Sequence, residues 1–432
     1  MPYFYKAPCK AKLNLIVLLL LTVFYTACAK THYQTADLVL KNAQVWEGDS
    51  FSQRDLAVKR GEIIDNFSIA ETSTVLDLTN KFIVPAYADA HQHKTPADKK
   101  TSDSYLKNGI FYIWNTNAET TEFDDQARQF FSQLETVDVK VALAGITEKG
   151  SHPEPFYVNF LGQYYQKTFD DYYQTAFNYG SNKGEIIDSL DRLKKQKTDY
   201  VKSYLLKSEN YGTIDEEGNL SLTGLNPAHI PFLVQEAKKR DLATFFHIET
   251  VHDLNVISAA NGDVAAHLPA YSPIRDYDNY TPERIAIDDA IAVQKAGLMV
   301  IATYFIAKYW YASDEAKQHN IKPENISKHY RLQAENLRVL QDAKVPILAG
   351  TDLPNGSLLN EVLHWVEIGG LTKSEALENL LSTGRLMFPE RKIGCFEAGC
   401  EADFLVLLSD PSEKLASLSE ISLIFKSGIQ IK

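Results

Sequence analysis

His91 and His93 follow the apolar run KFIVPAY closely, with one residue between them. Neutral imidazole nitrogens are common ligands of divalent metal ions, so the pair is a candidate metal site. Two polar residues in a turn would give the same pattern. Which interpretation holds depends on the polar residues that end the other apolar runs of the chain.

Four further apolar runs contain or end in a residue that could take part in metal chemistry. Lys202 lies in YVKSYLL, His247 in ATFFHIE and His267 in DVAAHL, and Asp352 ends VPILAGTD. Each has an ordinary explanation when taken alone: a strand lysine usually faces solvent, and Asp352 could cap the following helix. If the runs are parallel strands of one barrel, however, their carboxyl ends meet on one face. We therefore predict that these residues and the two histidines converge.

Metal-assisted hydrolysis explains why these residue types occur together. A metal ion lowers the pKa of a bound water to about 7, imidazoles hold the ion, and carboxylates bridge ions and carry protons. Two ions about 3.5 to 4 Å apart need a shared anionic ligand. A lysine meets that need only as a carbamate, formed with carbon dioxide, and burial makes its proton easier to lose. We predict two divalent metal ions and carboxylation of Lys202 at Nζ. Zinc is the first choice, and the ligand types also suit manganese or iron.

The elements that would position these residues alternate between strands and helices. After Pro85, eight β-rich apolar runs are separated by amphipathic segments over roughly 300 residues, which predicts a (β/α)8 TIM barrel over residues 85–389. Strand-like runs in residues 36–84 and 390–432 predict a small β-sandwich domain built from both ends of the chain. Residues 155–179 are rich in Tyr and Phe and too long for an ordinary connection. They form either a lid over the catalytic face or a helical insertion packed on the barrel.

The first 28 residues predict export from the cytoplasm. Three lysines precede the apolar run LIVLLLLTVF and the small residues around Cys28, as in a signal peptide. The sequence YTAC resembles a bacterial lipobox, so we predict a lipoprotein anchored to the membrane at Cys28. Ordinary signal cleavage would instead leave a periplasmic protein. Both outcomes place the protein in the cell envelope.

Charge and cysteine content restrict the partners further. The chain has 56 acidic and 44 basic residues, a net charge of -12 and no basic block. This charge makes nucleic acid an unsuitable partner and favours a small-molecule or dipeptide substrate. In an oxidising compartment Cys395 and Cys400 either pair as a disulfide or remain as two partly buried thiols. Nothing in the sequence fixes the oligomeric state.

Several stretches carry a resemblance to one known family. They are PAYADAHQH, DYVKSY, FFHIET, AAHLP, VPILAGTD and the ending GCFEAGCEADFLVLL. The first is similar to P-G-x-x-D-x-H-x-H, and the last to G-x-I-x-x-G-x-x-A-D-x-V-V-L, in the metal-dependent amidohydrolase superfamily. The chain resembles most the subgroup with a carboxylated lysine, which includes imidazolonepropionase-like proteins and Xaa-Pro or Xaa-Arg dipeptidases. It departs from the pattern at Ala86, where Gly is usual, and at Gln92, where Val, Thr or Cys is commoner.

The resemblance implies a role for each candidate residue. The ligands of the more buried metal ion would be His91, His93, Lys202 and Asp352, and those of the other would be Lys202, His247 and His267. Asp352 would also take the proton of the bridging hydroxide and pass it to the leaving amine. His152 would contact the substrate, although an ordinary surface-loop histidine fits equally well. Tyr204 or Tyr211 would polarise the scissile carbonyl.

The predicted function is hydrolysis of amide or peptide C–N bonds, by a dipeptidase or an N-acyl-amino-acid deacylase. A deaminase-type amidohydrolase is the alternative: Glu249 near His247 favours it, whereas Lys202 argues against it. A non-catalytic binding lipoprotein of the envelope is a further alternative. Such a protein has no physical need for the complete set of ligands.

Overall fold

Parallel strands and helices alternate through most of the chain. The computed structural model describes residues 33–93, 95–214, 221–277, 280–353 and 357–431, and its parallel sheets confirm the predicted α/β class. The predicted signal peptide and Cys28 lie outside the described residues. None of the described helices has the length and apolar character needed to cross a membrane.

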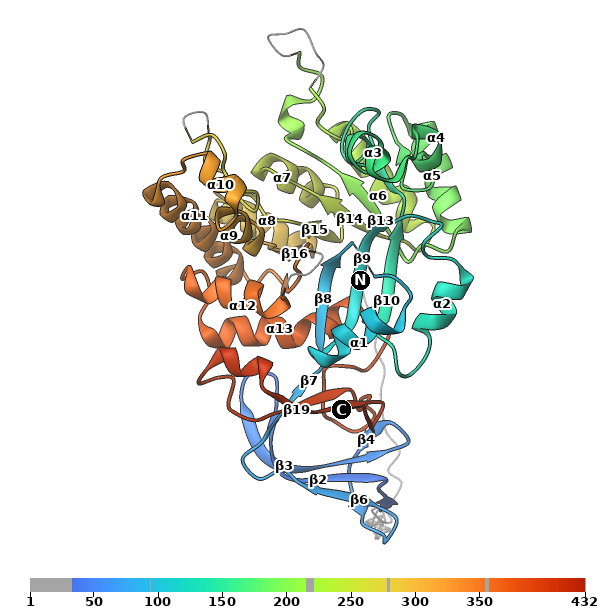
Figure 1. Cartoon of the computed structure of the whole chain (residues 1–432), viewed down its shortest axis with the longest axis vertical. Coiled ribbons are helices and arrows are strands. Elements are labelled where there is room, and N and C mark those ends of the chain that lie inside the picture. Colours follow the sequence, from blue (N-terminus) through green and yellow to red (C-terminus); the bar gives the residue numbers. More distant parts are fainter. Residues whose placement is uncertain (1–32, 94, 215–220, 278–279, 354–356, 432) are drawn as a thin grey trace, which may run out of the picture.

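The parallel strands form a three-stranded and a seven-stranded sheet (Figure 1). They are β8 (Tyr87–Gln92), β9 (Ile110–Ala118), β10 (Asp138–Leu143), β11 (Gly145–Thr147), β12 (Phe177–Tyr179), β13 (Tyr200–Tyr204), β14 (Ala243–His247), β15 (Val264–Ala266), β16 (Met299–Ile301) and β17 (Ile347–Leu348). Every residue of β8, β9 and β13 is buried. Burial on both faces is expected of parallel strands that are covered by helices.

Backbone hydrogen bonds bring the two parallel sheets edge to edge at both sides. At one side Ala90 N donates to Ala349 O at 2.9 Å, which joins β8 to the segment after β17. At the other side β10 continues into β11 after Ala144, and β10 pairs with β9 while β11 pairs with β13. A closed barrel requires both of these junctions.

Helices connect the strands and cover their outer surface (Figure 1). They are α1 (Lys99–Lys107), α2 (Asp125–Phe131), α5 (Lys183–Lys195), α6 (Ile230–Lys238), α7 (Val251–Ala259), α8 (Ile287–Ala296), α9 (Phe305–Tyr311), α10 (Asp314–Gln318), α11 (Pro323–Asp342), α12 (Leu358–Glu367) and α13 (Lys373–Met387). Local sequence explains several starts: α7 and α13 begin with capping boxes at Thr250 and Thr372, and α11 begins at a proline. These residues satisfy or remove the free N–H groups of a first helical turn.

Strands from both ends of the chain share one further sheet, which lies at the bottom of Figure 1. Its strands are β2 (Leu38–Trp46), β3 (Phe51–Lys59), β4 (Glu62–Ile64), β6 (Thr74–Asp77), β7 (Phe82–Pro85), β18 (Phe404–Leu407), β19 (Ile421–Lys426) and β20 (Ile429–Gln430). The short strands β1 (Gln34–Thr35) and β5 (Phe67–Ser68) pair separately. The predicted β-sandwich is not confirmed, because hydrogen bonds join the longer strands into a single sheet.

Residues 155–179 form a compact helical insertion that ends in a strand. It contains a π-helix (Phe156–Leu161), α3 (Gly162–Tyr165), α4 (Phe169–Tyr172) and β12. Tyr157, Tyr172, Ala176 and Phe177 form a separate apolar cluster there, and β12 extends the parallel sheet beside β11.

Cys395 and Cys400 form a disulfide with 5.9 Å between their Cα atoms. This bond settles the choice between a disulfide and two free thiols that the sequence left open.

Candidate metal centre

Four histidine rings gather at the carboxyl ends of three parallel strands. His91 lies in β8 and His93 directly after it, His247 ends β14, and His267 follows β15. The Nε2 atoms of His91 and His93 are 3.2 Å apart. The ring centroid of His267 is 4.7 Å from that of His91 and 4.5 Å from that of His247. The structure therefore brings together all four histidines that the sequence indicated as ligands.

The carboxylate of Asp352 lies among these rings. Its Oδ1 atom is 3.0 Å from Nε2 of His93 and 3.4 Å from Nε2 of His91. Its Oδ2 atom is 3.7 Å from Nε2 of His267. Ligand atoms of His91, His93 and Asp352 all lie within 4.8 Å of one another, a spacing that allows them to bind one ion.

Lys202 extends from β13 into the same region and is completely buried. Within the described residues its Nζ atom has no hydrogen-bond partner, and it lies 4.6 Å from the centroid of the Phe245 ring. Burial lowers the pKa of Lys202 to about 7, and the charge of Asp352 opposes that shift. A buried amine without a partner, partly neutral at pH 7, suits the formation of a carbamate.

Three of the histidines, His91, His247 and His267, are held in the neutral form that binds metal ions. Burial lowers the pKa of His247 to about 3, and the positive charge of Lys202 adds to the effect. Burial likewise holds the pKa of His91 and of His267 well below the ordinary value. Each of these three rings therefore offers an unprotonated nitrogen at pH 7. The donor set fits a divalent metal ion with nitrogen and oxygen ligands.

Three residues at the carboxyl ends of the strands have a left-handed backbone although none is glycine. The φ angles are 71° at His267, 52° at Thr303 after β16, and 49° at Asp352. A non-glycine residue in this region costs on the order of 1 to 3 kcal/mol, and such residues gather at functional sites. The strained positions turn the backbone just beyond the strand ends, where the candidate ligands lie.

A buried carboxylate, that of Asp89, ties two ligand-bearing segments together. It accepts hydrogen bonds from His91 N at 3.1 Å, from Thr351 N at 3.1 Å and from the Gln92 amide at 2.8 Å. Burial raises the pKa of Asp89 to about 6. Gln92 also donates to the Thr351 hydroxyl, so this residue, unusual beside the histidines, faces the protein interior. The roles of Asp89 and Gln92 depend on contacts with a distant segment, which the sequence motif does not reveal.

The predicted substrate residues fall into two groups. The ring centroid of His152 lies 5.5 Å from that of His247 and 5.3 Å from that of Tyr204, which is buried. Burial lowers the pKa of His152 to about 3. Tyr211 is 36% exposed, and its hydroxyl donates to Glu148 at 3.4 Å. The structure therefore brings His152 and Tyr204 to the histidine cluster, whereas Tyr211 lies further out.

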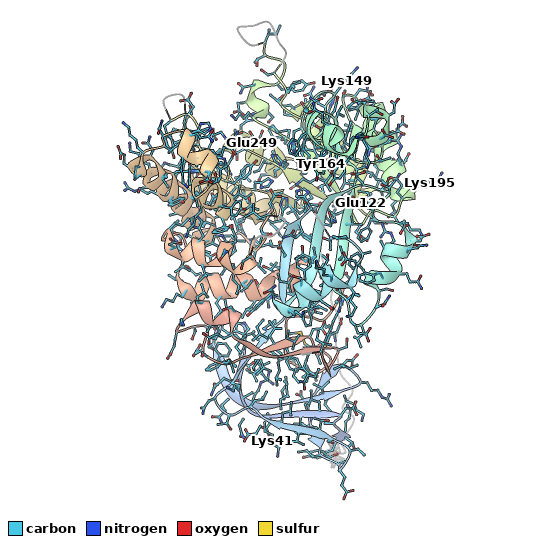
Figure 2. All side chains as sticks on the ribbon, viewed as in Figure 1. Lys41, Glu122, Lys149, Tyr164, Lys195 and Glu249 are labelled. Atoms are coloured by element: carbon cyan, nitrogen blue, oxygen red, sulfur yellow. A yellow bond between two sulfur atoms is a disulfide. The ribbon has the colours of Figure 1, made fainter. Side chains whose placement is uncertain are left out.

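Two more side chains border the cluster. The hydroxyl of Tyr271 is 3.4 Å from Nε2 of His247, and its ring stacks on His267 with centroids 4.1 Å apart. Tyr271, one of 23 tyrosines, was not among the predicted residues, because no motif distinguishes it. Glu249 Oε1 is 3.8 Å from Nε2 of His247. Figure 2 shows Glu249 and Tyr164 at the end of the molecule opposite Lys41, which lies in the small sheet.

Comparisons with known proteins identify the fold. No model of a protein family matches the sequence, and no curated protein matches it. Among solved structures, the chain is similar to an amidohydrolase (TM-score 0.68, 17% identity, 91% of this chain and 98% of that one). It is also similar to a Xaa-Pro dipeptidase with bound methionine in the active site (TM-score 0.67, 15% identity, 91% of this chain and 99% of that one). A third similar structure is the ochratoxinase of A. niger (TM-score 0.69, 17% identity, 92% of this chain and 96% of that one). Over nearly its whole length, the chain has the fold of these amidohydrolase and dipeptidase structures.

Proposed function

We propose that the protein is a metal-dependent hydrolase of amide or peptide C–N bonds, a (β/α)8 barrel enzyme of the amidohydrolase superfamily. The observation that carries this proposal is the burial of Lys202, without a hydrogen-bond partner in the described chain, near neutral histidines and Asp352. Burying an amine in this way costs free energy. Carboxylation of Lys202 and binding of metal ions would remove that cost.

The ligands divide into two sets that share the modified lysine. We propose that Lys202, as a carbamate, would serve as a ligand in both sets for two divalent ions, with zinc as the first choice. One ion would be held by His91, His93 and Asp352, whose ligand atoms already lie within 4.8 Å of one another. The other would be held by His247 and His267, whose ring centroids are 4.5 Å apart. Zinc accepts such nitrogen and oxygen ligands at about 2.0 to 2.2 Å.

The chemistry then follows from the side chains around the ions. Bound metal ions would lower the pKa of water and polarise the scissile carbonyl. Asp352 would accept the proton of the attacking water and deliver it to the leaving nitrogen, because its carboxylate lies between the rings of His93 and His267. This proton transfer lets the amine leave as a neutral group.

The substrate would bind against the residues that border the ligands. We propose that His152 and Tyr204 form one wall and Tyr271 the other, because their rings contact His247 or His267. Phe156 extends the first wall outward, with its ring centroid 6.5 Å from that of His152. A dipeptide or an N-acyl amino acid has the size and the apolar groups that such walls accept.

A combined metal and activity assay tests this proposal. Purified protein should contain one to two metal ions per chain, and a panel of dipeptides and N-acyl amino acids, assayed with zinc and bicarbonate, should include a substrate. The variant Lys202→Ala should bind less metal than wild type and lose activity. A preparation with less than one ion per chain, together with an unaffected Lys202→Ala variant, would refute the proposal.

One observation favours a second function, deamination. Glu249 lies 3.8 Å from His247, where a carboxylate could exchange protons with a nucleobase or guanidine. Release of ammonia from such compounds, in an assay that detects no hydrolysis of dipeptides or N-acyl amino acids, would favour this alternative. Loss of that ammonia release in Glu249→Gln, with metal content unchanged, would assign the proton transfer to Glu249.

We also propose that the protein is exported and anchored in the cell envelope through Cys28. The support for export is the signal-like sequence before that cysteine. We propose separately that residues 36–84 and 390–432 form a small β domain. Mass spectrometry of the mature N-terminus would decide between a lipidated Cys28 and ordinary cleavage. An N-terminus that begins at Met1 in cells would contradict export.

A further inference from the structure

We propose that Thr303 is a positioning residue that fixes the ring of His267 with Nδ1 protonated and Nε2 free to bind a metal ion. This inference rests on the proposed function and adds a role for the loop after β16, whose strand supplies none of the proposed ligands. It concerns the orientation and tautomer of one ligand, and it is argued from hydrogen bonds among buried groups.

The contact between the two side chains is short and buried. Nδ1 of His267 lies 2.8 Å from Oγ1 of Thr303, and the two residues are 2% and 0% exposed. Oγ1 also lies 2.8 Å from Ala302 O, a carbonyl that can only accept. The hydroxyl hydrogen therefore points to Ala302, and the hydroxyl oxygen accepts the hydrogen of Nδ1. The lone pair of Nε2 then faces Asp352, whose Oδ2 is 3.7 Å away.

The backbone of Thr303 is fixed by a second buried group, Glu361. Its carboxylate accepts hydrogen bonds from Tyr304 N at 2.8 Å and Phe305 N at 2.6 Å. The indole of Trp365 donates to the same carboxylate at 2.7 Å. These bonds hold the chain directly after Thr303, which itself has the left-handed φ of 52°. A β-branched residue rarely adopts this conformation, so the surrounding contacts must impose it.

The segments that carry His267 and Thr303 are also joined at a second point. The hydroxyl of Tyr304 donates to Pro269 O at 3.0 Å, and Asn336 donates to the same carbonyl at 3.1 Å. Thr303 contacts His267 and the next residue, Tyr304, contacts Pro269. These two contacts prevent the loop after β16 from shifting relative to the loop after β15. The hydroxyl of Thr303 therefore stays within reach of the imidazole.

Such an outer hydrogen bond is expected to matter for metal binding. A histidine ligand needs its second nitrogen to donate a hydrogen bond, and loss of the acceptor typically weakens metal affinity by about 10 to 100-fold. Removal of the hydroxyl would leave a buried Nδ1–H without a partner. The ring would then shift toward the other tautomer, in which Nε2 carries the proton and cannot bind the ion.

The experiment compares three variants of the full chain. Thr303→Val removes the hydroxyl with little change in volume, and Thr303→Ser retains it. Thr198→Val is the matched control, because Thr198 is buried just before β13, where its hydroxyl accepts from Leu143 N at 3.1 Å and donates to Tyr200 O at 2.8 Å. Zinc affinity is measured by chelator competition. The tautomer is read from ring 15N–1H spectra of metal-free, histidine-labelled protein, with the His267 signals assigned from the His267→Gln variant.

We expect the wild-type spectrum to show His267 with Nδ1 protonated. Thr303→Val should lose that signal and bind zinc about 10 to 100-fold more weakly. The zinc affinity of Thr303→Ser should stay within about 3-fold of wild type. Thr198→Val should keep the zinc affinity of wild type. A wild-type ring protonated at Nε2, or wild-type zinc affinity in Thr303→Val, would overturn the inference. If wild type binds no zinc, the proposed function fails, whereas the metal-free spectrum still tests the contact.

Discussion

Asp352 and His93 are joined by a 3.0 Å contact between Oδ1 and Nε2, although one follows the last parallel strand and the other the first. The contact depends on the junction between β8 and β17, where Asp352 N also donates to His91 O at 2.8 Å. The two segments meet only when the sheet edges come together. Formation of the candidate metal site is therefore coupled to the pairing of these edges.

Substitution of Asp352 by asparagine tests its proposed role in proton transfer. An amide keeps a ligand oxygen but cannot accept a proton at neutral pH. We expect Asp352→Asn to lower kcat by about 10² to 10⁴-fold, while the bound metal falls by less than one ion per chain. Steady-state kinetics and metal analysis of the same preparation provide the measurement. A variant with wild-type kcat would exclude proton transfer by this carboxylate.

Carboxylation of Lys202 predicts that assembly of the metal site depends on carbon dioxide. Metal-free protein in buffer depleted of carbon dioxide should take up at most one zinc ion per chain, and added bicarbonate should restore the second. Lys202→Met, of similar length and without an amine, should bind the same amount of zinc with or without bicarbonate. Uptake of two ions by the depleted wild-type protein would contradict a carbamate bridge.

Glu361 predicts how stability depends on pH. Burial raises the pKa of Glu361 from 4.5 to about 7, so between these values the folded chain holds a proton that the unfolded chain has released. The contribution of Glu361 to the free energy of unfolding should therefore fall as pH rises from about 5 to 7, by up to about 1.4 kcal/mol per pH unit. The stability advantage of wild type over Glu361→Gln should shrink over the same range. Urea denaturation of the metal-free proteins at several pH values measures it, and a constant difference would contradict the raised pKa.

Removal of the Asp89 carboxylate should weaken both folding and metal binding. Asp89→Ala leaves the buried N–H groups of His91 and Thr351 without their acceptor. Each lost acceptor costs about 1 to 3 kcal/mol, so the free energy of unfolding should fall by at least about 2 kcal/mol. Zinc affinity should fall as well. Asp103→Ala, at a partly exposed position of α1 where the carboxylate pairs with Lys99, serves as the control and should leave zinc affinity unchanged.

Residues at strand ends could be recognised in the sequence because their positions follow from a local pattern. Each candidate ligand lies within or just beyond an apolar run, and parallel strands bring such ends together. That pattern alone is sufficient to group His247, His267 and Lys202. It also predicts the α/β class, because apolar runs alternate with amphipathic segments.

Features that depend on contacts between distant segments could not be predicted in this way. Thr303 and Tyr271 contact His267 through a hydrogen bond and a stacked ring, and their local sequence resembles that of many buried polar residues. Tyr211 was proposed for its place after the lysine strand, but its side chain faces Glu148. Strand patterns also do not specify which strands pair, so the predicted β-sandwich stays a prediction.

The sheet formed from both ends of the chain has a consequence for the order in which the protein can complete its fold. Strand β7 leads directly into β8, yet its neighbour β18 is formed by Phe404–Leu407. During synthesis one edge of β7 therefore stays unpaired until the chain between these strands has been made. A segment that emerges late closes the sheet from which β8 starts, so a chain cut short before Phe404 would expose that edge of β7 to other strands.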